Sequence, residues 1–465
     1  MCGIFGVSGV PDAAQIVNLG LYALQHRGQE SAGIVSVDDQ GRSYGHRGMG
    51  LVPDIFKPDV LERLPGPVAI GHTRYSTTGT SALSNAQPCL VNYHSGPLAL
   101  AHNGTLTNAG TLRDDLVRTG SIFQTSSDSE VLVHLIARSE ARRPEDQILD
   151  ALERVEGAYS LVMVIGRSLY AVVDPRGFRP LILAKVGDGY AVGSETCAMD
   201  MIGARVIKEL QPGEWLRIDD DGVTDLPPLP AKQHTRCIFE LIYFSRPDSV
   251  IFGQSVERAR RNLGRRLAME HPAPGADCVF SVPDSSNAMA LGYAAESGIT
   301  LEHGLIRNHY IGRTFISPIQ QNRTEKAKIK FNPVREVVSD KSVVVVDDSL
   351  VRGTTSQSLI RMIRHAGARE IHLRIASPPI TGPCYYGIDT PTRSELIAAN
   401  HSVEEIRQHL QVDTLGYLSL EGTHEAMSPS RSTFCDACFS GNYPTGVPDT
   451  VSREFDEQPI STVTN

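Results

Sequence analysis

Residues 343–356 read VVVVDDSLVRGTTS, and this stretch indicates the fold of the second half of the chain. Four consecutive valines form an unbroken β-branched run, which is typical of a parallel strand buried on both faces. Two aspartates and a Gly-Thr-Thr turn then lead into a helix predicted from about Ser356 to Ala366. Gly367 stops this helix before a second apolar run, EIHLRIAS. A strand, a helix and a further strand in this order predict an α/β domain with a mainly parallel sheet.

The turn after the valine strand predicts a phosphate site. Backbone N–H groups at such a turn, with a helix N-terminus behind them, bind phosphate. Asp347 and Asp348 do not bind phosphate themselves, but carboxylates accept hydrogen bonds from a sugar diol or lie beside Mg²⁺. A simple strand-to-helix turn with capping residues remains the alternative for the aspartate pair alone. The string is not the Gly-x-x-x-x-Gly-Lys-Ser pattern of nucleoside triphosphatases.

The same string resembles the phosphoribosylpyrophosphate motif of type I phosphoribosyltransferases. This resemblance implies that Asp347 and Asp348 contact the ribose hydroxyls and, together with Ser285, lie at a magnesium ion. The residues that it implies for the 5′-phosphate are Ser349, Arg352, Gly353, Thr354 and Thr355. The sequence VPDSSN at 282–287 resembles the pyrophosphate loop and supplies Asp284 and Ser285 as substrate contacts.

A basic segment that starts at Tyr310, YIGRTFISPIQQNRTEKAKIKFNP, resembles the mobile loop that closes over the substrate in these enzymes. Its lysines, which include Lys326, Lys328 and Lys330, suit a leaving group that carries several negative charges. Lys330 is the expected pyrophosphate contact. The residues alone leave a solvated basic stretch open as the alternative.

The first 220 residues contain short apolar runs that end in glycine or polar turns, which predicts closely spaced strands. Helices are expected at about Ala13–Leu24 and from Ser129 through Ala137. Strands paired with strands, with helices packed outside, predict a layered α+β domain. The proline-rich stretch at 221–234 fits a linker. The expected domains are residues 2–230 and 231–448, followed by a polar tail at 449–465. Near the end, Ser402-x-x-Glu405 is a capping box that predicts one more helix.

Cys2 is a candidate nucleophile, because it becomes the first residue once Met1 is removed. A terminal α-amine titrates near 8 and can serve as the base for the side chain of its own residue. An inert second-position cysteine is the alternative. Only Met1 precedes Cys2 here, so we expect an aminopeptidase to suffice for maturation.

Three further motifs supply what hydrolysis of a side-chain amide needs. Arg74, at the end of a predicted strand, is a natural clamp for a carboxylate. Asn103 and Gly104 end another strand and offer N–H donors for a tetrahedral oxyanion. Asp128 opens a helix, where it could pair with a substrate ammonium. A salt bridge, a turn and a helix cap are the structural alternatives when each motif is taken singly.

The motifs CGIFG, HRGQ, GHTRYST, AHNGTLTN and TSSDSE, in this order, resemble the glutaminase domain of the class II glutamine amidotransferases. The resemblance covers residues 2 to about 215 and implies an N-terminal-nucleophile fold, an αββα sandwich. It makes Cys2 both nucleophile and base, and Asn103 and Gly104 the oxyanion hole. The residues implied to bind glutamine are Arg74, Asp128 and Gly28.

A glutaminase followed by a phosphoribosyltransferase resembles one family, the glutamine phosphoribosylpyrophosphate amidotransferases. The implied reaction converts 5-phosphoribosyl-1-pyrophosphate and glutamine into 5-phosphoribosylamine, glutamate and pyrophosphate, the first committed step of purine synthesis. Ammonia is expected to pass internally from the first site to the second. The resemblance further implies feedback inhibition by purine nucleotides and a homo-oligomer, commonly a tetramer.

Four cysteines form a candidate metal site. Cys435 and Cys438 make a C-x-x-C pair, while Cys237 and Cys384 lie far away in the sequence. A site with four thiolates holds zinc or an iron–sulfur cluster, and spacing does not choose between them. The sequences around Cys384 and Cys435 resemble the branch of the family that carries a structural [4Fe–4S] cluster on these four cysteines. Cys89, Cys197 and Cys278 are expected to be buried small hydrophobic residues.

Composition limits the remaining possibilities. The formal net charge is −9, which argues against a general nucleic-acid or membrane-surface binder. No apolar run approaches a membrane span, and no signal peptide is evident, so a soluble cytoplasmic protein is expected. Another class II amidotransferase is one rival, and the string at 343–356 argues against it. A regulator that senses phosphoribosylpyrophosphate or a nucleotide without turnover is the other.

Overall fold

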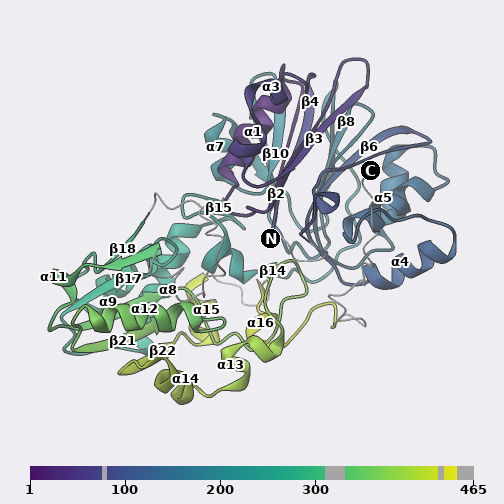
Figure 1. Cartoon of the computed structure of the whole chain (residues 1–465). Helices are drawn as coiled ribbons and strands as arrows, with labels where there is room; N and C mark the ends of the chain where they lie inside the picture. Colours follow the sequence, from purple (N-terminus) through teal and green to yellow (C-terminus); the bar gives the residue numbers. More distant parts are fainter. Residues whose placement is uncertain (76–80, 309–329, 428–433, 448–465) are drawn as a thin grey trace, which may run out of the picture. The chain divides into compact units, whose positions relative to one another are not determined.

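The computed structural model describes residues 1–75, 81–308, 330–427 and 434–447 (Figure 1). The chain forms two compact units. Unit 1 consists of Met1–Arg236, Tyr385–Asp389 and Tyr443–Asn465, and unit 2 consists of Cys237–Cys384 and Thr390–Asn442. The main division falls shortly after the expected boundary at 230/231. Two short segments from later in the chain nevertheless belong to the first unit. The expected domains were continuous in sequence and did not include this exchange. The expected tail at 449–465 lies outside the described residues.

Unit 1 contains two antiparallel sheets. Short β-branched and apolar runs separated by glycine turns favour this architecture, because such runs pair with their neighbours through tight connections. The first sheet has the order β11-β9-β10-β1-β4-β2-β3. Its strands are β1 (Gly3–Ser8), β2 (Ser31–Val37), β3 (Ser43–Met49), β4 (Val68–Arg74), β9 (Ile182–Val186), β10 (Gly189–Gly193) and β11 (Arg205–Glu209).

The second sheet of unit 1 has the order β13-β12-β8-β7-β6-β5. Its strands are β5 (Cys89–Tyr93), β6 (Gly96–Leu106), β7 (Gly157–Ile165), β8 (Ser168–Val173), β12 (Trp215–Asp219) and β13 (Gly222–Asp225). Ile4 and Ile70 of the first sheet and Ala101 and Val162 of the second belong to one buried cluster, which fills the space between the sheets. β1, which directly follows Cys2, and β6, which carries Asn103 and Gly104, therefore both border this core.

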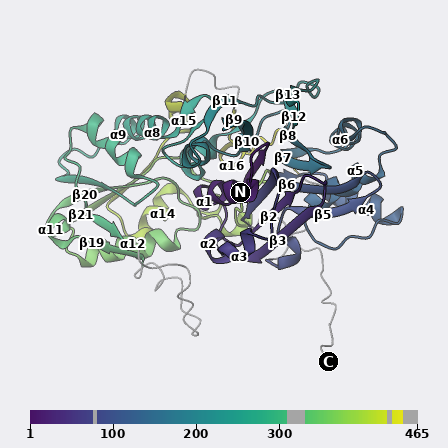
Figure 2. The ribbon, with the colours of Figure 1, turned by 90° about the horizontal axis from the view of Figure 1, so that it is seen from above.

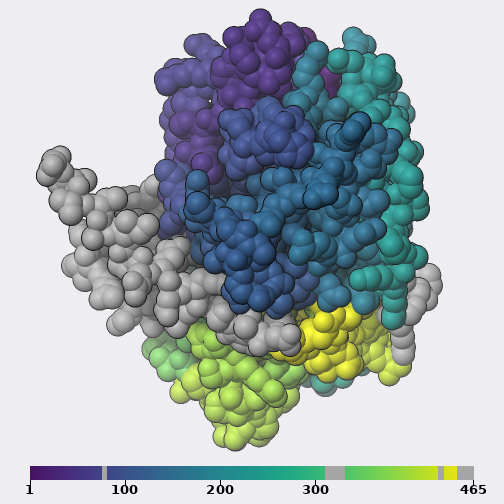
Figure 3. Space-filling view, turned by 90° about the vertical axis from the view of Figure 1, so that its right-hand side faces the viewer, coloured from purple at the N-terminus to yellow at the C-terminus, as the bar shows by residue number. Residues whose placement is uncertain are grey.

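Helices cover the outer face of each sheet. The first sheet packs against α1 (Ala13–Ala23), α2 (Val52–Ile55) and α7 (Thr196–Met201). The second packs against α4 (Ala109–Arg118), α5 (Ser129–Arg138) and α6 (Pro144–Leu152), whose residues contribute to the blue part of the surface in Figure 3. The expected αββα sandwich is confirmed. The two helices expected from sequence correspond to α1 and α5, each within one residue of its expected bounds.

Unit 2 is built on a parallel sheet with the order β17-β20-β21-β22. Its strands are β17 (Cys278–Ser281), β20 (Ser342–Asp347), β21 (Glu370–Ile375) and β22 (Thr414–Tyr417). Figure 2 shows α8 (Val256–Glu270) and α9 (Asn287–Ser297) on one side of the sheet, and α12 (Thr354–His365) and α14 (Val403–Leu410) on the other. The predicted α/β domain is thus confirmed, and the helix expected from Ser356 begins two residues earlier.

The capping box at the start of α14 is also confirmed, since Ser402 accepts a hydrogen bond from the Glu405 N–H and Glu405 accepts one from the Ser402 N–H. No helix within the described residues is both long and apolar enough to cross a membrane.

Candidate active sites

Cys2 lies directly before β1, the middle strand of the first sheet, and only 7 % of it is exposed. Its backbone N–H donates to Asn103 Oδ1 at 3.2 Å. Its Sγ lies 3.7 Å from the carbonyl oxygen of Tyr75, just after β4. The Nε of Arg27 donates to the Cys2 carbonyl oxygen at 3.0 Å. Three segments that are distant in sequence therefore hold the candidate nucleophile.

Asn103 and Gly104 lie next to Cys2 near the end of β6. Asn103 is fully buried, and its Nδ2 has no hydrogen-bond partner within the part of the chain that the structure describes. Buried amide groups are normally satisfied, so an unused donor beside a thiol indicates a function. Gly104 has a φ of +152°, and a Cβ there would lie 1.9 Å from the Ala158 carbonyl oxygen. Only glycine fits this position. Asn103 thus offers an unused side-chain N–H next to Cys2, and Gly104 follows it directly in β6.

Arg74 and Gly28 meet at the end of β4. Arg74 is 3 % exposed and forms an ion pair with Glu30. A Cβ on Gly28 would lie 2.5 Å from the Thr73 carbonyl oxygen, so the loop before β2 approaches β4 as closely as a glycine allows. The structure thus brings both residues to the strand end that leads to Tyr75, the neighbour of the Cys2 thiol.

Asp128 precedes α5 and is 8 % exposed. Its Oδ2 accepts a hydrogen bond from the Leu106 backbone N–H at 2.9 Å, at the end of the strand that carries Asn103 and Gly104. This contact fixes one carboxylate oxygen against β6. All six residues expected in the glutaminase site therefore lie on, or directly contact, β1, β4 and β6.

An ionic network behind Cys2 was not anticipated from sequence. Glu195, fully buried after β10, accepts hydrogen bonds from Arg27 Nη1 at 2.5 Å and interacts with His26 Nε2 at 2.8 Å. Burial alone would raise the pKa of Glu195, but the charges and hydrogen bonds of His26 and Arg27 bring it well below its usual range. Arg27 is thereby held against the Cys2 carbonyl. The HRGQ motif was visible, but Glu195 lies 168 residues away. The only feature of the sequence that could have pointed to Glu195 is its position as an acidic residue just after an apolar strand.

The two aspartates of unit 2 lie where β20 ends, and three serine hydroxyls surround them. Ser285 Oγ donates to Asp348 Oδ2 at 2.5 Å, and Ser286 Oγ donates to Asp347 Oδ1 at 3.3 Å. Ser349 Oγ donates to Asp348 Oδ1 at 2.5 Å. The loop at 282–287 and the string after β20, which lie about 60 residues apart, therefore form one site. Ser286 is the member that sequence reasoning did not single out.

The carboxyl groups of this pair resist ionisation. Burial raises the pKa of Asp347 well above its usual value, and the neighbouring charge of Asp348 raises it further. Burial also raises the pKa of Asp348, although hydrogen bonds from Ser285 and Ser349 and the charge of Arg260 oppose the shift. A bound cation or the hydroxyl donors of a sugar would relieve this cost. The residues expected at the magnesium ion therefore fit a divalent cation.

The expected phosphate turn begins α12. Gly353 caps the helix with a φ of +77°, and Thr354 and Thr355 form its first turn. Arg352 forms an ion pair with Glu395 at 3.1 Å, and both side chains are substantially exposed. The backbone of this turn and the helix N-terminus are thus arranged as an anion site requires.

The remaining expected contacts in unit 2 are less tightly held. Asp284 forms an ion pair with Arg307. Lys330, directly before β19 (Phe331–Pro333), is exposed and carries its Nζ 5.6 Å from the centroid of the Phe331 ring. Lys326 and Lys328, with the rest of the basic segment up to residue 329, lie outside the described residues.

The four candidate cluster cysteines gather within unit 2. Cys237 and Cys435 lie on the paired strands β14 (Arg236–Cys237) and β23 (Phe434–Cys435), and Cys438 lies in α16 (Ala437–Ser440). Burial raises the pKa of Cys438 well above its usual value, and the neighbouring Cys384, Cys237 and Cys435 raise it further. Such mutual repulsion is what a bound cationic centre relieves, so the donor set fits an iron–sulfur cluster or zinc. Among the described residues, however, no three His, Cys, Asp or Glu side chains are already arranged around a metal position.

Comparisons with known proteins show the family of this chain. A family model described as a glutamine amidotransferase domain matches residues 72–201. The amidophosphoribosyltransferase of Bacillus subtilis is 49 % identical over 451 residues, which cover 96 % of this chain and 94 % of that protein. Amidophosphoribosyltransferase 2, chloroplastic, of Arabidopsis thaliana is 50 % identical over 444 residues, which cover 95 % of this chain and 79 % of that protein.

Solved structures agree as well. The glutamine phosphoribosylpyrophosphate amidotransferase from B. subtilis complexed with ADP and GMP has a TM-score of 0.91 to this chain and 48 % sequence identity, covering 97 % of this chain and 99 % of that one. A second structure, described as the allosteric regulatory enzyme of purine biosynthesis, also has a TM-score of 0.91 and 48 % identity, covering 96 % of this chain and 98 % of that one.

Proposed function

The chain belongs to the amidophosphoribosyltransferase family, and we propose that its two units divide the family reaction between the residues described above. The activity is glutamine-dependent amidation of 5-phosphoribosyl-1-pyrophosphate to 5-phosphoribosylamine, the first step of purine biosynthesis. The observation that carries the assignment of residues is the buried Asn103 amide, whose Nδ2 is unused within the described residues while its Oδ1 contacts Cys2.

In unit 1, Cys2 is the proposed nucleophile once removal of Met1 has freed its α-amine. The amine takes the thiol proton, and Sγ attacks the side-chain amide carbon of glutamine. Asn103 Nδ2 and the Gly104 N–H donate to the oxyanion of the tetrahedral intermediate. The amine then returns its proton to the leaving ammonia. Water hydrolyses the resulting glutamyl thioester to glutamate.

Glutamine is held at both ends of its α-amino acid group in this proposal. Arg74 binds the α-carboxylate, and it can keep Glu30 as a partner because a guanidinium has five N–H donors. Asp128 binds the α-ammonium through the carboxylate oxygen that Leu106 does not occupy. Gly28 is the third proposed glutamine-binding residue, and it lets its loop lie against β4 beside Arg74, since a side chain there would collide with the β4 backbone.

In unit 2, Asp347 and Asp348 accept hydrogen bonds from the ribose hydroxyls. The proposed 5′-phosphate contacts are Ser349, Arg352, Gly353, Thr354 and Thr355. Asp284, Ser285 and Lys330 are the proposed residues at the pyrophosphate. Asp347, Asp348 and Ser285 would hold Mg²⁺, which when bound neutralises charge on the departing pyrophosphate.

Ammonia attacks C1 of the ribose and the C1–O bond to pyrophosphate breaks. Internal transfer of ammonia is part of the proposal, because ammonium in bulk water is no nucleophile.

The assignment of the two half-reactions to separate units predicts that glutamine hydrolysis is coupled to pyrophosphate release. Glutamate release from glutamine should rise sharply when phosphoribosylpyrophosphate and Mg²⁺ are added, and pyrophosphate should appear in equal amount. We would measure both products on anaerobically purified protein. Glutamate release that ignores phosphoribosylpyrophosphate would mean that the acceptor has been misassigned. No release from protein whose Met1 is absent by mass spectrometry would refute the role of Cys2.

Cys237, Cys384, Cys435 and Cys438 are the proposed ligands of a [4Fe–4S] cluster. Its proposed contribution is structural, since hydrolysis and glycosyl transfer need no electron transfer. The carbonyl oxygen of Cys438 accepts hydrogen bonds from the N–H groups of Thr381 and Gly382, which ties the segment that leads to Cys384 to α16. A cluster of four irons spans more space than one zinc ion, which suits thiols that gather without surrounding a single metal position.

Anaerobically purified protein should contain about four iron and four sulfide equivalents per chain and absorb visible light. Cys438→Ser should lose most of the iron, because three ligands hold a cluster poorly. Cys278→Ser, which replaces another buried cysteine of the same unit, is the matched control and should retain it. Zinc in stoichiometric amount, or equal iron in both variants, would contradict the assignment.

Three further properties are proposed from the family. Purine nucleotides are the proposed feedback inhibitors, in keeping with the ADP and GMP of the B. subtilis complex. A homotetramer is the proposed assembly. The cytoplasm is the proposed location, on the cysteine usage of the sequence.

A further inference from the structure

Residues Tyr385–Asp389 pack within unit 1, although the chain on both sides of them belongs to unit 2. We call this segment the Tyr386 loop. Its two ends are joined, since the Cys384 backbone N–H donates to Thr390 Oγ1 at 2.5 Å. Five residues that the sequence assigns to the phosphoribosyltransferase domain are thus part of the glutaminase unit.

Tyr386 anchors this loop in unit 1, where it is only 2 % exposed. Its ring stacks on Phe178, with centroids 4.5 Å apart and an interplanar angle of 23°. Its carbonyl oxygen accepts a hydrogen bond from Arg179 Nη2 at 2.7 Å. Its hydroxyl accepts one from the Thr445 backbone N–H at 3.1 Å. Stacking and hydrogen bonds from two directions hold the loop in one position.

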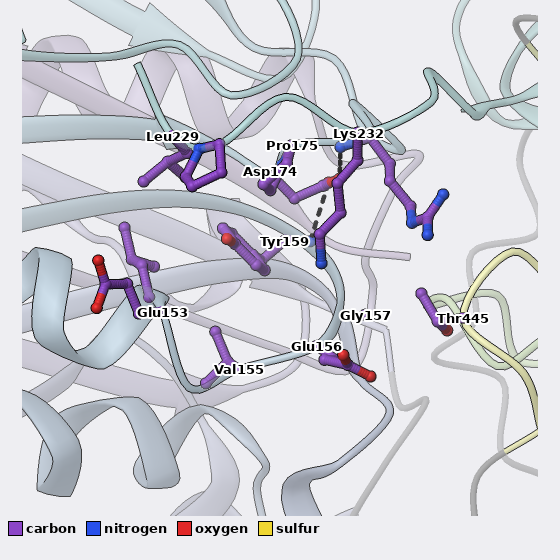
Figure 4. A pocket seen from close by; sticks show the side chains of 13 residues that line it. Glu153, Val155, Glu156, Gly157, Tyr159, Asp174, Pro175, Leu229, Lys232 and Thr445 are labelled. Carbon is purple, nitrogen blue, oxygen red and sulfur yellow. Dashed lines mark hydrogen bonds between the residues drawn. The ribbon is translucent and has the colours of Figure 1, made fainter. Parts of the chain in front are cut away.

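The surface that receives Tyr386 is fixed by a buried carboxylate. Asp174 accepts backbone hydrogen bonds from Tyr159, Arg176, Gly177 and Phe178 at 2.8–3.2 Å. Burial raises the pKa of Asp174 to about 6, although these hydrogen bonds oppose the shift. Figure 4 shows Asp174 and Thr445 among the residues that line a cavity of about 220 Å³ beside this turn. The turn that carries Phe178 and Arg179 is therefore preformed.

Gly387 brings the loop against the proposed oxyanion hole. Its φ is +108°, and a Cβ there would lie 3.0 Å from both the carbonyl carbon and the Cα of Gly104. On its other side Gly104 abuts the Ala158 carbonyl oxygen, where a Cβ would lie at 1.9 Å. The peptide that carries one proposed oxyanion donor is thus enclosed between β7 and the Tyr386 loop.

We propose that the Tyr386 loop is a positioning element for glutamine hydrolysis, which packs against Gly104 and keeps its N–H directed at the oxyanion. This inference rests on the proposed function, in which Gly104 has that role. Oxyanion donors act only when they are held to a fraction of an ångström, and misplacement by about 1 Å can cost about 100-fold in rate. The glutaminase site is therefore completed, within unit 1, by a segment that lies about 280 residues later in the chain than Gly104.

Gly387→Ala tests the proposal, with Gly96→Ala as matched control. Gly96 begins β6, has nearly the same φ of +106°, and a Cβ there would meet nothing within 4 Å. Both variants place an alanine at nearly the same positive φ, but only Gly387→Ala adds a Cβ against Gly104. We expect its glutamine-dependent kcat to fall roughly 10- to 100-fold with the KM for glutamine within about twofold. Ammonia-dependent synthesis should stay within about twofold in both variants.

A second variant covers the case in which Gly387→Ala does not fold. Tyr386→Phe keeps the ring stack and loses only the hydroxyl, so it should lower glutamine-dependent kcat by about two- to fivefold and leave ammonia-dependent synthesis unchanged. Alkylation of Cys2 by iodoacetamide should proceed at the wild-type rate in both variants, because that reaction forms no oxyanion.

Three outcomes would overturn the proposal. They are equal losses in Gly387→Ala and Gly96→Ala, equal losses with glutamine and with ammonia, and a raised KM with unchanged kcat. Failure of the underlying assignment looks different. In that case Cys2→Ala would itself retain glutamine-dependent synthesis, whatever the loop variants do.

Discussion

Cys2→Ala protein is expected to make no measurable phosphoribosylamine from glutamine while it keeps full synthesis from added ammonia. Without the thiol no glutamyl thioester forms, and loss of a nucleophile of this kind lowers the rate by roughly 10⁴-fold or more. Unit 2 has its own sheet and core, so its site should be unaffected. Pyrophosphate release with each nitrogen source measures both activities in one assay.

Asn103→Ala is the informative comparison for this variant. It keeps the thiol and removes one oxyanion donor, so glutamine-dependent synthesis should fall by about 10²- to 10³-fold rather than vanish. Intact mass should be recorded for each protein, because the chemistry needs Met1 removed, and Met1 is 1 % exposed in the unprocessed chain. If ammonia-dependent synthesis disappears together with the glutamine reaction, Cys2 is not confined to the first step.

Asp347→Asn and Asp348→Asn are expected to abolish synthesis from both nitrogen sources and to make the ligand-free protein more stable. The first effect follows from the lost ribose and magnesium contacts. The second follows from the raised pKa of both groups, because ionisation then costs more in the folded than in the unfolded chain. The resulting loss of folding stability is absent well below the ordinary aspartate pKa of about 4, where both carboxyl groups are protonated in the folded and the unfolded chain. The loss grows as the pH rises through that value toward the pKa of the folded protein.

The measurement is thermal unfolding without magnesium or substrate, at pH 8 and again near pH 4. Both variants should unfold at a higher temperature than wild type at pH 8, and this difference should shrink in acid. Asp413→Asn is the control with the opposite sign. Although burial opposes it, hydrogen bonds from Arg364 and the Ile371 N–H and the charge of Arg364 lower the pKa of Asp413, so its replacement should cost stability at pH 8. Unchanged or lower stability in both aspartate-pair variants, or retained synthesis, would refute the assigned role.

Local sequence predicted the elements and the order of the motifs. The run Val343–Val346 became the buried strand β20, and the capping box at Ser402 began α14 where it was expected. Such features can be predicted from the sequence because strand patterns, helix capping and glycine turns depend on residues a few positions apart. The same holds for the chemical inventory, since each motif carries its reactive groups within a few residues.

Contacts between residues that lie far apart in the sequence could not be predicted from the sequence. Glu195 beside Arg27, Glu30 beside Arg74, and Ser286 beside Asp347 each depend on how strands are ordered in a sheet. One-dimensional spacing does not specify these contacts, because many strand orders satisfy the same hydrophobic pattern. The gathering of the four cysteines required the family resemblance for the same reason.

The sequence by itself thus determined the two domain classes, the family and the residue types available for catalysis. Tertiary structure alone decided which groups meet, and the Tyr386 loop shows this most clearly. Nothing between Cys384 and Thr390 marks those residues as part of the first unit. They belong there because Tyr386 stacks on Phe178 and because Gly387, with a φ of +108°, lies in close contact with the backbone of Gly104. Close packing of two backbones is a property of the folded chain, and no local pattern encodes it.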